Sequence, residues 1–208
     1  VDAVLAQRTR LRGSQPPGDQ FGSLPPSSPL LRVEVQQPTV PNFDIVAAYV
    51  RPDDVIIDVG GGASTLVDDL LHAGYRRLTV LDLSRTALAV AQARLGDEAR
   101  HVTWLEADVT LVTLPSQAFD LWHDRAVFHF LTGEREREAY VASVMHAVKP
   151  GGYVIVATFA EDGPLQCSGL PVVRYSPEGL HAEFGSPFTL LKHEREEHHT
   201  PSGSVPMR

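Results

Sequence analysis

The sequence has one cysteine, two lysines and no long hydrophobic run. Cys167 stands alone among 208 residues, which excludes an internal disulfide and any thiolate cluster built by one chain. The longest apolar run, Tyr153 to Ala160, is far shorter than the ~20 residues that cross a bilayer, so we expect no membrane span. Lys149 and Lys192 are the only lysines, and the formal net charge of −8 argues against a broad nucleic-acid-binding face.

The N-terminal part differs in composition from the rest. Arg8, Arg10 and Arg12 interrupt any apolar segment of a secretion signal, so we expect a cytoplasmic protein. Residues 13–41 hold seven of the sixteen prolines, and such a segment is not expected to form a regular helix or a central strand. We therefore expect residues 1–41 to be an arm, flexible or capping the body, and residues 42–208 to be the domain.

From residue 53 onward, short apolar runs alternate with helical patterns. The predicted strands are residues 55–59, 78–82, 101–105, 119–123, 153–159 and 188–192. The predicted helices lie between Pro41 and Pro52, at 65–72, 86–95 and 134–148, and from Ser176 to Gly185. This alternation predicts an α/β fold with a doubly wound, mostly parallel sheet covered on both faces.

Polar and glycine residues follow the first three predicted strands. Asp58 precedes the glycine triplet 60–62, while Asp82 and Asp108 follow the next two strands. Ligands bind beyond the carboxyl ends of the strands in such sheets, so these residues should converge there. Glycine permits close approach of the backbone to a ligand, and Asp82 could accept ribose hydroxyls. The alternative for Asp82 is a turn residue ahead of the helix cap Ser84.

These features resemble the class I S-adenosylmethionine-dependent methyltransferases over about residues 42–193. Residues 58–62 match the first motif of the family, with Ser64 in place of its last glycine, and residues 106–108 match the motif whose aspartate meets the adenine amino group. Residues 148–153 resemble the turn before the fifth strand. The resemblance implies S-adenosylmethionine as cofactor, held by Asp58, Gly60, Gly62, Asp82, Leu83, Asp108 and Val109.

The same resemblance implies a C-terminal hairpin whose last strand runs antiparallel. Residues 200–208 are short and contain Pro201 and Pro206. We therefore expect that last strand to be missing, truncated or very short.

The resemblance places the methyl-transfer chamber at residues 119–131. A base is needed there only if the acceptor atom carries a proton. His123 and His129 are the candidate bases, with Asp124 as orienter or substrate contact. The alternatives are a core role for His129, which lies in an apolar run, and an ion-pair network of residues 123–125 that braces the loop.

Two later segments carry further residues of interest. Residues 159–175 are too long for a plain connector and are expected to form a lid or substrate wall, with Cys167 as filler or as a contact to a soft substrate. His193, His198 and His199 lie in a charged tail that we interpret as solvated, and no metal site is expected.

Together these features predict an S-adenosylmethionine-dependent methyltransferase acting on a small-molecule acceptor. The alternatives are a protein lysine N-methyltransferase, a silent cofactor-binding protein and a nicotinamide-dependent oxidoreductase. The oxidoreductase is disfavoured because Asp58 precedes the glycines and Thr65 stands where its third glycine belongs. The oligomeric state stays open.

Overall fold

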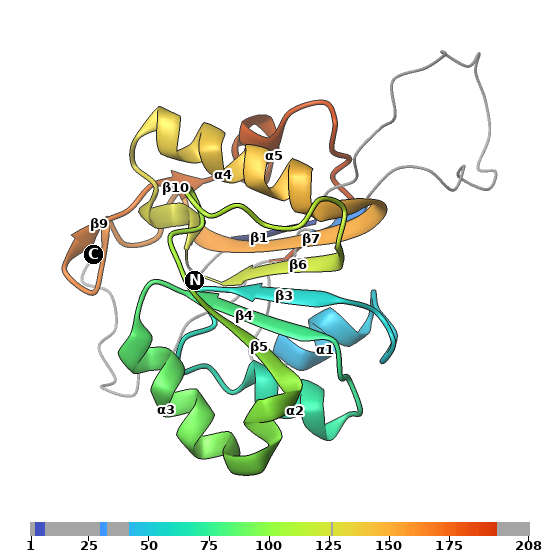
Figure 1. Cartoon of the computed structure of the whole chain (residues 1–208). Coiled ribbons are helices and arrows are strands. Elements are labelled where there is room, and N and C mark those ends of the chain that lie inside the picture. Colours follow the sequence, from blue (N-terminus) through green and yellow to red (C-terminus); the bar gives the residue numbers. More distant parts are fainter. Residues whose placement is uncertain (1–2, 7–29, 33–41, 126, 195–208) are drawn as a thin grey trace, which may run out of the picture.

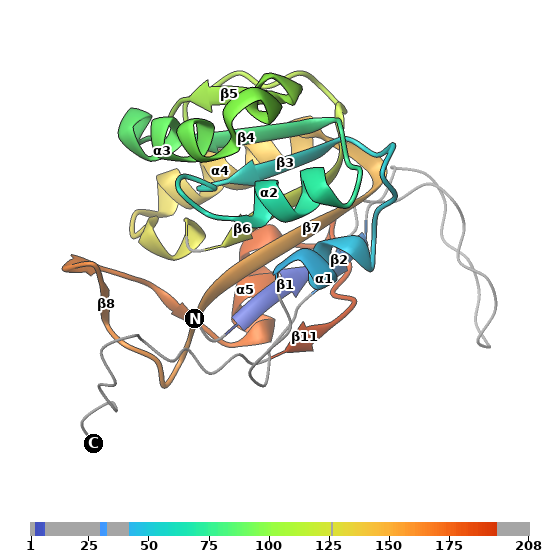
Figure 2. The ribbon, with the colours of Figure 1, turned by 90° about the horizontal axis from the view of Figure 1, so that it is seen from below.

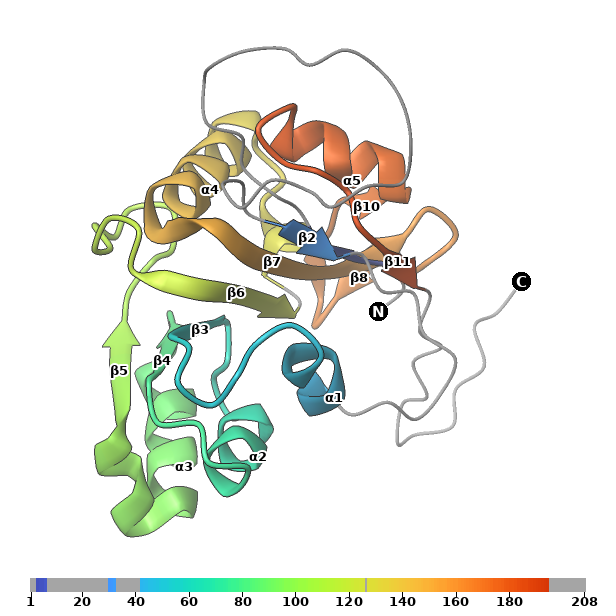
Figure 3. The same ribbon diagram turned by 90° about the vertical axis from the view of Figure 1, so that its right-hand side faces the viewer.

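The computed structural model describes residues 3–6, 30–32, 42–125 and 127–194. A twisted sheet lies between two helical layers, with α4 and α5 on one face and α1, α2 and α3 on the other (Figures 1 and 3). The helices are α1 (Asn42–Ala47), α2 (Leu66–His72), α3 (Arg85–Leu95), α4 (Glu134–Ala147) and α5 (Pro177–Phe184), with 3-10 turns η1 (Gly96–His101) and η2 (Phe128–Phe130).

Five parallel strands form the centre of the sheet. They run in the order β5-β4-β3-β6-β7, and their bounds are β3 (Ile56–Val59), β4 (Leu78–Asp82), β5 (Val102–Glu106), β6 (Phe119–Arg125) and β7 (Val148–Ala160). β3 is the first of these five strands in the sequence; β4 and β5 lie on one side of it, and β6 and β7 lie on the other. The connecting helices therefore cover both faces of the sheet. The predicted doubly wound, mostly parallel sheet is confirmed.

The outer edge of β7 is covered by two strands from the N-terminal part of the chain. The strand β1 (Ala3–Ala6) pairs antiparallel with β7, and β2 (Leu30–Arg32) pairs parallel with it. The two-residue strand β11 (His193–Glu194) pairs antiparallel with β1. An N-terminal strand therefore lies antiparallel at this edge, and the last strand within the described residues, β11, has two residues.

Two sequence predictions at this edge are wrong. Residues 13–41 were expected to give no regular helix and no central strand, yet Leu30–Arg32, a stretch without proline, lies between β1 and β7 in the sheet. Residues 188–192 do not form a strand, because Phe188 folds back onto α5, with its ring 5.3 Å from that of Phe184. The expectations for residues 195–208, including His198 and His199, and for most of the arm lie outside the described residues.

The two faces of the sheet carry separate hydrophobic cores. One core packs Trp122, Tyr140 and Phe184 between the sheet, α4 and α5. The other packs α1, α2 and α3 against the opposite face and includes Val46 and Leu70. In the part of the chain that the structure describes, no helix is long and apolar enough to cross a membrane.

Beyond the carboxyl end of β7 the chain forms a hairpin of β8 (Gln166–Cys167) and β9 (Leu170–Pro171). Figure 2 shows this hairpin extending away from the sheet. The chain then returns through β10 (Arg174–Tyr175), which pairs parallel with the end of β7. Leu165 and Leu170 are exposed by 66% and 57%, so the hairpin offers apolar side chains beyond the carboxyl edge of the sheet.

Candidate functional site

The loop between β3 and α2 is built around two glycines with positive φ. Gly60 has a φ of +72°, and a Cβ added there would lie 2.1 Å from Cγ2 of Val127. Gly62 has a φ of +39°, and its Cβ would lie 2.8 Å from Oδ2 of Asp82. Only glycine fits both the backbone angle and the contact at these positions. The loop therefore lies directly against the turn after β6 and the carboxylate that ends β4.

An arginine on α3 holds the far side of this loop. The guanidinium of Arg94 donates to the carbonyl oxygens of Ala63 and Ser64 at 2.9 and 2.6 Å, and to the Asp68 carboxylate at 2.6 and 2.8 Å. Ser64, which replaces the last glycine of the motif, accepts a hydrogen bond from the Leu66 N–H at 3.2 Å, just before α2. The fork of Arg94 fixes the loop before any ligand arrives.

The other predicted cofactor residues lie at the ends of β4 and β5. Asp82 accepts from the Ser84 N–H at 2.7 Å through Oδ1, which leaves Oδ2 beside Gly62. Leu83 is exposed by 71%. Asp108 accepts from the N–H and hydroxyl of Thr110 through one oxygen.

Val109 differs from these residues because its side chain is 5% exposed and belongs to the core. The parallel register that pairs β3 with β4 and β4 with β5 brings Asp58, Asp82 and Asp108 to the same edge of the sheet.

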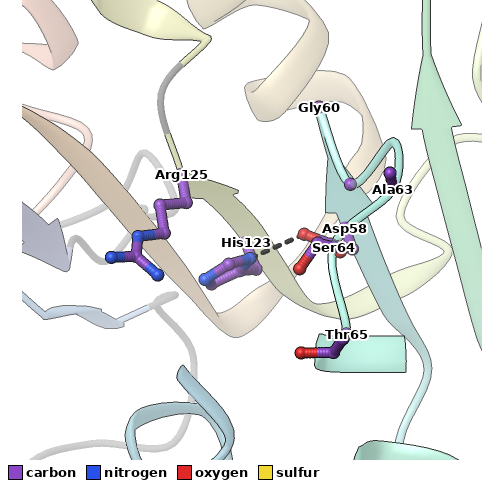
Figure 4. A pocket seen from close by; sticks show the side chains of 8 residues that line it. Asp58, Gly60, Ala63, Ser64, Thr65, His123 and Arg125 are labelled. Carbon is purple, nitrogen blue, oxygen red and sulfur yellow. Dashed lines mark hydrogen bonds and ion pairs between the residues drawn. The ribbon is translucent and has the colours of Figure 1, made fainter. Parts of the chain in front are cut away.

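A cavity of about 440 Å³ opens beside the glycine loop. Its walls combine the loop with two side chains of β6 (Figure 4), and the lining residues are Asp58, Gly60, Gly61, Ala63, Ser64, Thr65, His123 and Arg125. Asp58 and His123 are 5% and 4% exposed, and Nδ1 of His123 lies 2.7 Å from Oδ1 of Asp58. Of the three predicted catalytic residues, His123 is the one that lines this cavity.

Asp124 points to the opposite face of β6 and is completely buried. Its carboxylate accepts from the N–H groups of Val127 and Phe128, at 2.8 and 3.1 Å, and from the Tyr140 hydroxyl at 2.6 Å. Burial raises the pKa of Asp124 to about 6, against the effect of these hydrogen bonds. This geometry supports the bracing interpretation of Asp124, and the carboxylate that holds the His123 ring is Asp58.

His129 also lies away from the cavity, in the 3-10 turn η2. The residue is completely buried, and its ring stacks on that of Phe159 with centroids 4.9 Å apart. Neither ring nitrogen has a hydrogen-bond partner in the described part of the chain. Burial lowers the pKa of His129 to about 4. A neutral, buried imidazole of this kind supports the core interpretation that the sequence left open.

The residues present fit an adenosyl cofactor with a cationic sulfur. A carboxylate stands at the end of β4 with one oxygen against Gly62, which suits a pair of ribose hydroxyls. The glycines keep side chains out of the loop, and Asp58 puts a second carboxylate in the cavity wall.

The order and direction of the strands define a Rossmann-like α/β domain. Residues 56–152, just under half of the chain, match the family model described as "Methyltransferase domain". This part of the chain is therefore similar to a methyltransferase domain.

Curated proteins with similar sequences include enzymes that act on proteins and enzymes that act on small molecules. The eEF1A lysine and N-terminal methyltransferase of Danio rerio is 25% identical over 121 residues, which is 57% of this chain and 18% of that protein. The ubiquinone/menaquinone biosynthesis C-methyltransferase UbiE of Shewanella piezotolerans is 25% identical over 123 residues, 57% of this chain and 48% of that protein. The chain thus spans less than half of the length of these relatives.

Solved structures show the same fold. An S-adenosylmethionine-dependent methyltransferase of Mesorhizobium loti superposes with a TM-score of 0.55 at 19% identity, covering 68% of this chain and 77% of that one. Phosphoethanolamine N-methyltransferase 2 of Haemonchus contortus, solved with S-adenosyl-L-methionine, gives 0.55 at 20% identity, covering 69% and 35%. At these identities the comparison establishes the architecture.

Sequence reasoning did not single out several residues of this site. Arg94 lies 26 to 31 positions from the groups it binds, and no local pattern connects them. The Tyr140 hydroxyl accepts a hydrogen bond from the Trp122 indole N–H at 2.9 Å and donates one to the Asp124 carboxylate. These bonds connect α4 with β6. The alternation of side chains along β6 was the one available signal, because it places His123 and Asp124 on opposite faces.

Proposed function

We propose that the chain transfers the methyl group of S-adenosylmethionine to a small-molecule acceptor. The observation that carries this proposal is the close approach of the Asp82 carboxylate to Gly62, in a glycine loop whose other residues line a cavity of about 440 Å³. A cavity of this size is within the usual range for small-molecule sites, roughly 300–1,000 Å³. The match of residues 56–152 to a methyltransferase domain supports the reaction type.

In this proposal the cofactor is held by the loop and the strand ends. Asp82 accepts the ribose hydroxyls, Asp108 meets the adenine amino group, and the exposed side chain of Leu83 covers the base. Gly60 and Gly62 admit the ligand to the backbone, and Val109 contributes through its main chain because its side chain is buried. S-adenosylmethionine supplies a methyl group already activated by a positive sulfur, so the chain's own task is to position the acceptor and exclude water.

Labelling can separate the proposed acceptor class from its alternatives. The purified chain is incubated with methyl-tritiated S-adenosylmethionine and either the ultrafiltrate or the protein fraction of a cell extract. Label in the ultrafiltrate supports a small-molecule acceptor, whereas label in proteins supports a protein methyltransferase, as the similarity to the Danio rerio enzyme suggests. Calorimetry with S-adenosylmethionine and with NAD accompanies the assay.

The combined results separate the remaining alternatives. Cofactor binding without transfer in either fraction identifies a silent binding protein, and no binding of S-adenosylmethionine overturns the proposal. The cytoplasmic location is also part of the proposal, and cell fractionation tests it. Native mass spectrometry tests the oligomeric state, for which we propose no value.

A further inference from the structure

The parallel register of the two central strands brings a carboxylate and an imidazole together. Asp58 on β3 is the direct register partner of His123 on β6, and their side chains leave the sheet on the same face. Nδ1 and Oδ1 are 2.7 Å apart, and both residues are buried. The pair is therefore fixed by the backbone pairing of the sheet and shielded from competing water.

The chemistry of the two groups determines which ring nitrogen is available. An ionised carboxylate only accepts hydrogen bonds, so Nδ1 of His123 must carry the proton in this contact. In the neutral imidazole, Nε2 then keeps its lone pair. Figure 4 shows this end of the ring pointing away from Asp58, toward the side of the cavity where the Arg125 guanidinium lies.

No other carboxylate in the described strands takes this position. Asp124 is adjacent in sequence, but it faces α4 and is engaged by Tyr140 and two backbone N–H groups. Asp58 is thus the group that sets the orientation and tautomer of His123. A histidine held by a carboxylate at Nδ1, with Nε2 open toward a cavity, is the arrangement of a general base.

We propose that Asp58 and His123 form a carboxylate–imidazole pair in which Nε2 of His123 accepts a proton from the methyl acceptor. This inference rests on the function proposed above and narrows its substrate class. The acceptor atom carries a proton before the reaction, as in a hydroxyl, a phenol or an amine N–H. Thioethers and tertiary amines, which lose no proton on methylation, are outside this class.

The step balances without any further reactant. The acceptor lone pair forms the bond to the methyl carbon, and the carbon–sulfur bond breaks with its electron pair left on sulfur. The proton of the acceptor passes to Nε2, and Asp58 stabilises the imidazolium that results. That proton then leaves through the cavity, which is open to solvent. Asp58 acts as a positioning residue, and His123 is the catalytic residue.

The tautomer of His123 tests the pair without any acceptor or cofactor. In ¹⁵N-histidine-labelled protein, multiple-bond NMR correlations show which ring nitrogen carries hydrogen, and His123→Gln assigns the signal. We expect the neutral ring of the unsubstituted protein to carry its hydrogen on Nδ1. Asp58→Asn should move population to the Nε2–H tautomer because an amide can donate to Nδ1, whereas the exposed control Asp53→Asn should not. Hydrogen on Nε2, or on both nitrogens, in the unsubstituted protein overturns the proposal.

A transfer assay completes the test at saturating S-adenosylmethionine, so that altered cofactor affinity does not enter. Asp58→Asn and His123→Gln should lower label incorporation into the ultrafiltrate by about 10²–10⁴-fold. The exposed controls Asp53→Asn and His101→Gln should retain it. Transfer by Asp58→Asn at the control rate overturns the pair and leaves the proposed function standing. Absence of cofactor binding by the unsubstituted chain overturns the proposed function, whatever the tautomer.

Discussion

Replacing Gly60 by alanine is expected to destabilise the fold by about 2–5 kcal/mol, for two separable reasons. The left-handed backbone at Gly60, with a φ of +72°, costs a residue with a side chain about 1–2 kcal/mol. The added Cβ would lie 2.1 Å from Cγ2 of Val127, and overpacking of this kind costs about 1–3 kcal/mol. The sum is a large part of the ~5–15 kcal/mol that stabilises a typical domain.

Gly74 provides a matched control for the backbone part. Its φ is +94°, and a Cβ added there has no atom within 4 Å, so Gly74→Ala should cost about 1–2 kcal/mol. Val127→Ala in the Gly60→Ala background removes Cγ2, and the nearest remaining Val127 atom is Cβ at 3.6 Å. The double variant should therefore regain the part of the unfolding free energy that Gly60→Ala loses through steric overlap with Val127.

Urea unfolding followed by circular dichroism gives the free energy of unfolding of Gly60→Ala, Gly74→Ala, Val127→Ala and the Gly60→Ala/Val127→Ala double variant. The double-mutant cycle of Gly60→Ala and Val127→Ala should show a coupling of about 1–3 kcal/mol. Equal costs for Gly60→Ala and Gly74→Ala, with no coupling to Val127, would refute the close approach of the glycine loop to the turn after β6.

Three further predictions concern single side chains. Asp82→Ala should weaken S-adenosylmethionine binding by about 1.5–3 kcal/mol, the value of hydrogen bonds to a charged group, and unchanged affinity in calorimetry removes Asp82 from the site. The unfolded imidazole of His129 takes up a proton below about pH 6.5, whereas burial lowers the folded pKa to about 4, so stability is lost as the pH falls. The free energy of unfolding of His129→Phe, relative to that of wild type, should thus be about 2 kcal/mol higher at about pH 5 than near neutrality. The variant should retain methyl transfer. A difference in urea unfolding that does not change with pH, or a loss of transfer, contradicts the core role. For Asp124, the folded pKa of about 6 lies above the ordinary value of 3.8, so its contribution to stability falls as the pH rises from about 4 to about 6, and unfolding measurements should show the cost of Asp124→Asn shrinking over that interval.

The strands and the cofactor edge could be predicted because the relevant signals are local. Each central strand is a short apolar run, and glycine or a serine cap marks where the following helix begins or ends. In a parallel sheet the carboxyl ends of neighbouring strands meet at one edge. The placement of Asp58, Asp82 and Asp108 at one edge therefore follows once the strands are placed, and the parallel register of β3, β4 and β5 is consistent with it.

The covering of the β7 edge could not be predicted from local signals. β1 pairs with residues about 150 positions away in sequence, and a four-residue strand has too few residues for a periodic pattern. The proline content of residues 13–41 was a valid reason against a long strand. It did not exclude three residues, Leu30–Arg32, between the prolines at 29 and 38.

The role of Asp124 as orienter of His123 was one of those left open, and it could be considered because the predicted strand ended two residues too early. With β6 ending at His123, Asp124 becomes a loop residue free to turn toward the histidine. The strand in fact continues to Arg125, and the two-residue period of a strand then sends Asp124 to the opposite face. A correct boundary would have left a carboxylate on a neighbouring strand as the orienting group, and Asp58 is the register partner.

The end of β6 connects the two sides of the candidate site. On one face, His123 is tied to Asp58, which immediately precedes the glycine loop. On the other face, Asp124 accepts the N–H group of Val127, whose side chain closes on Gly60. The same loop is therefore held at its first residues through both faces of one strand. A change that loosens the turn after β6 should therefore displace the glycine loop and the His123 ring together.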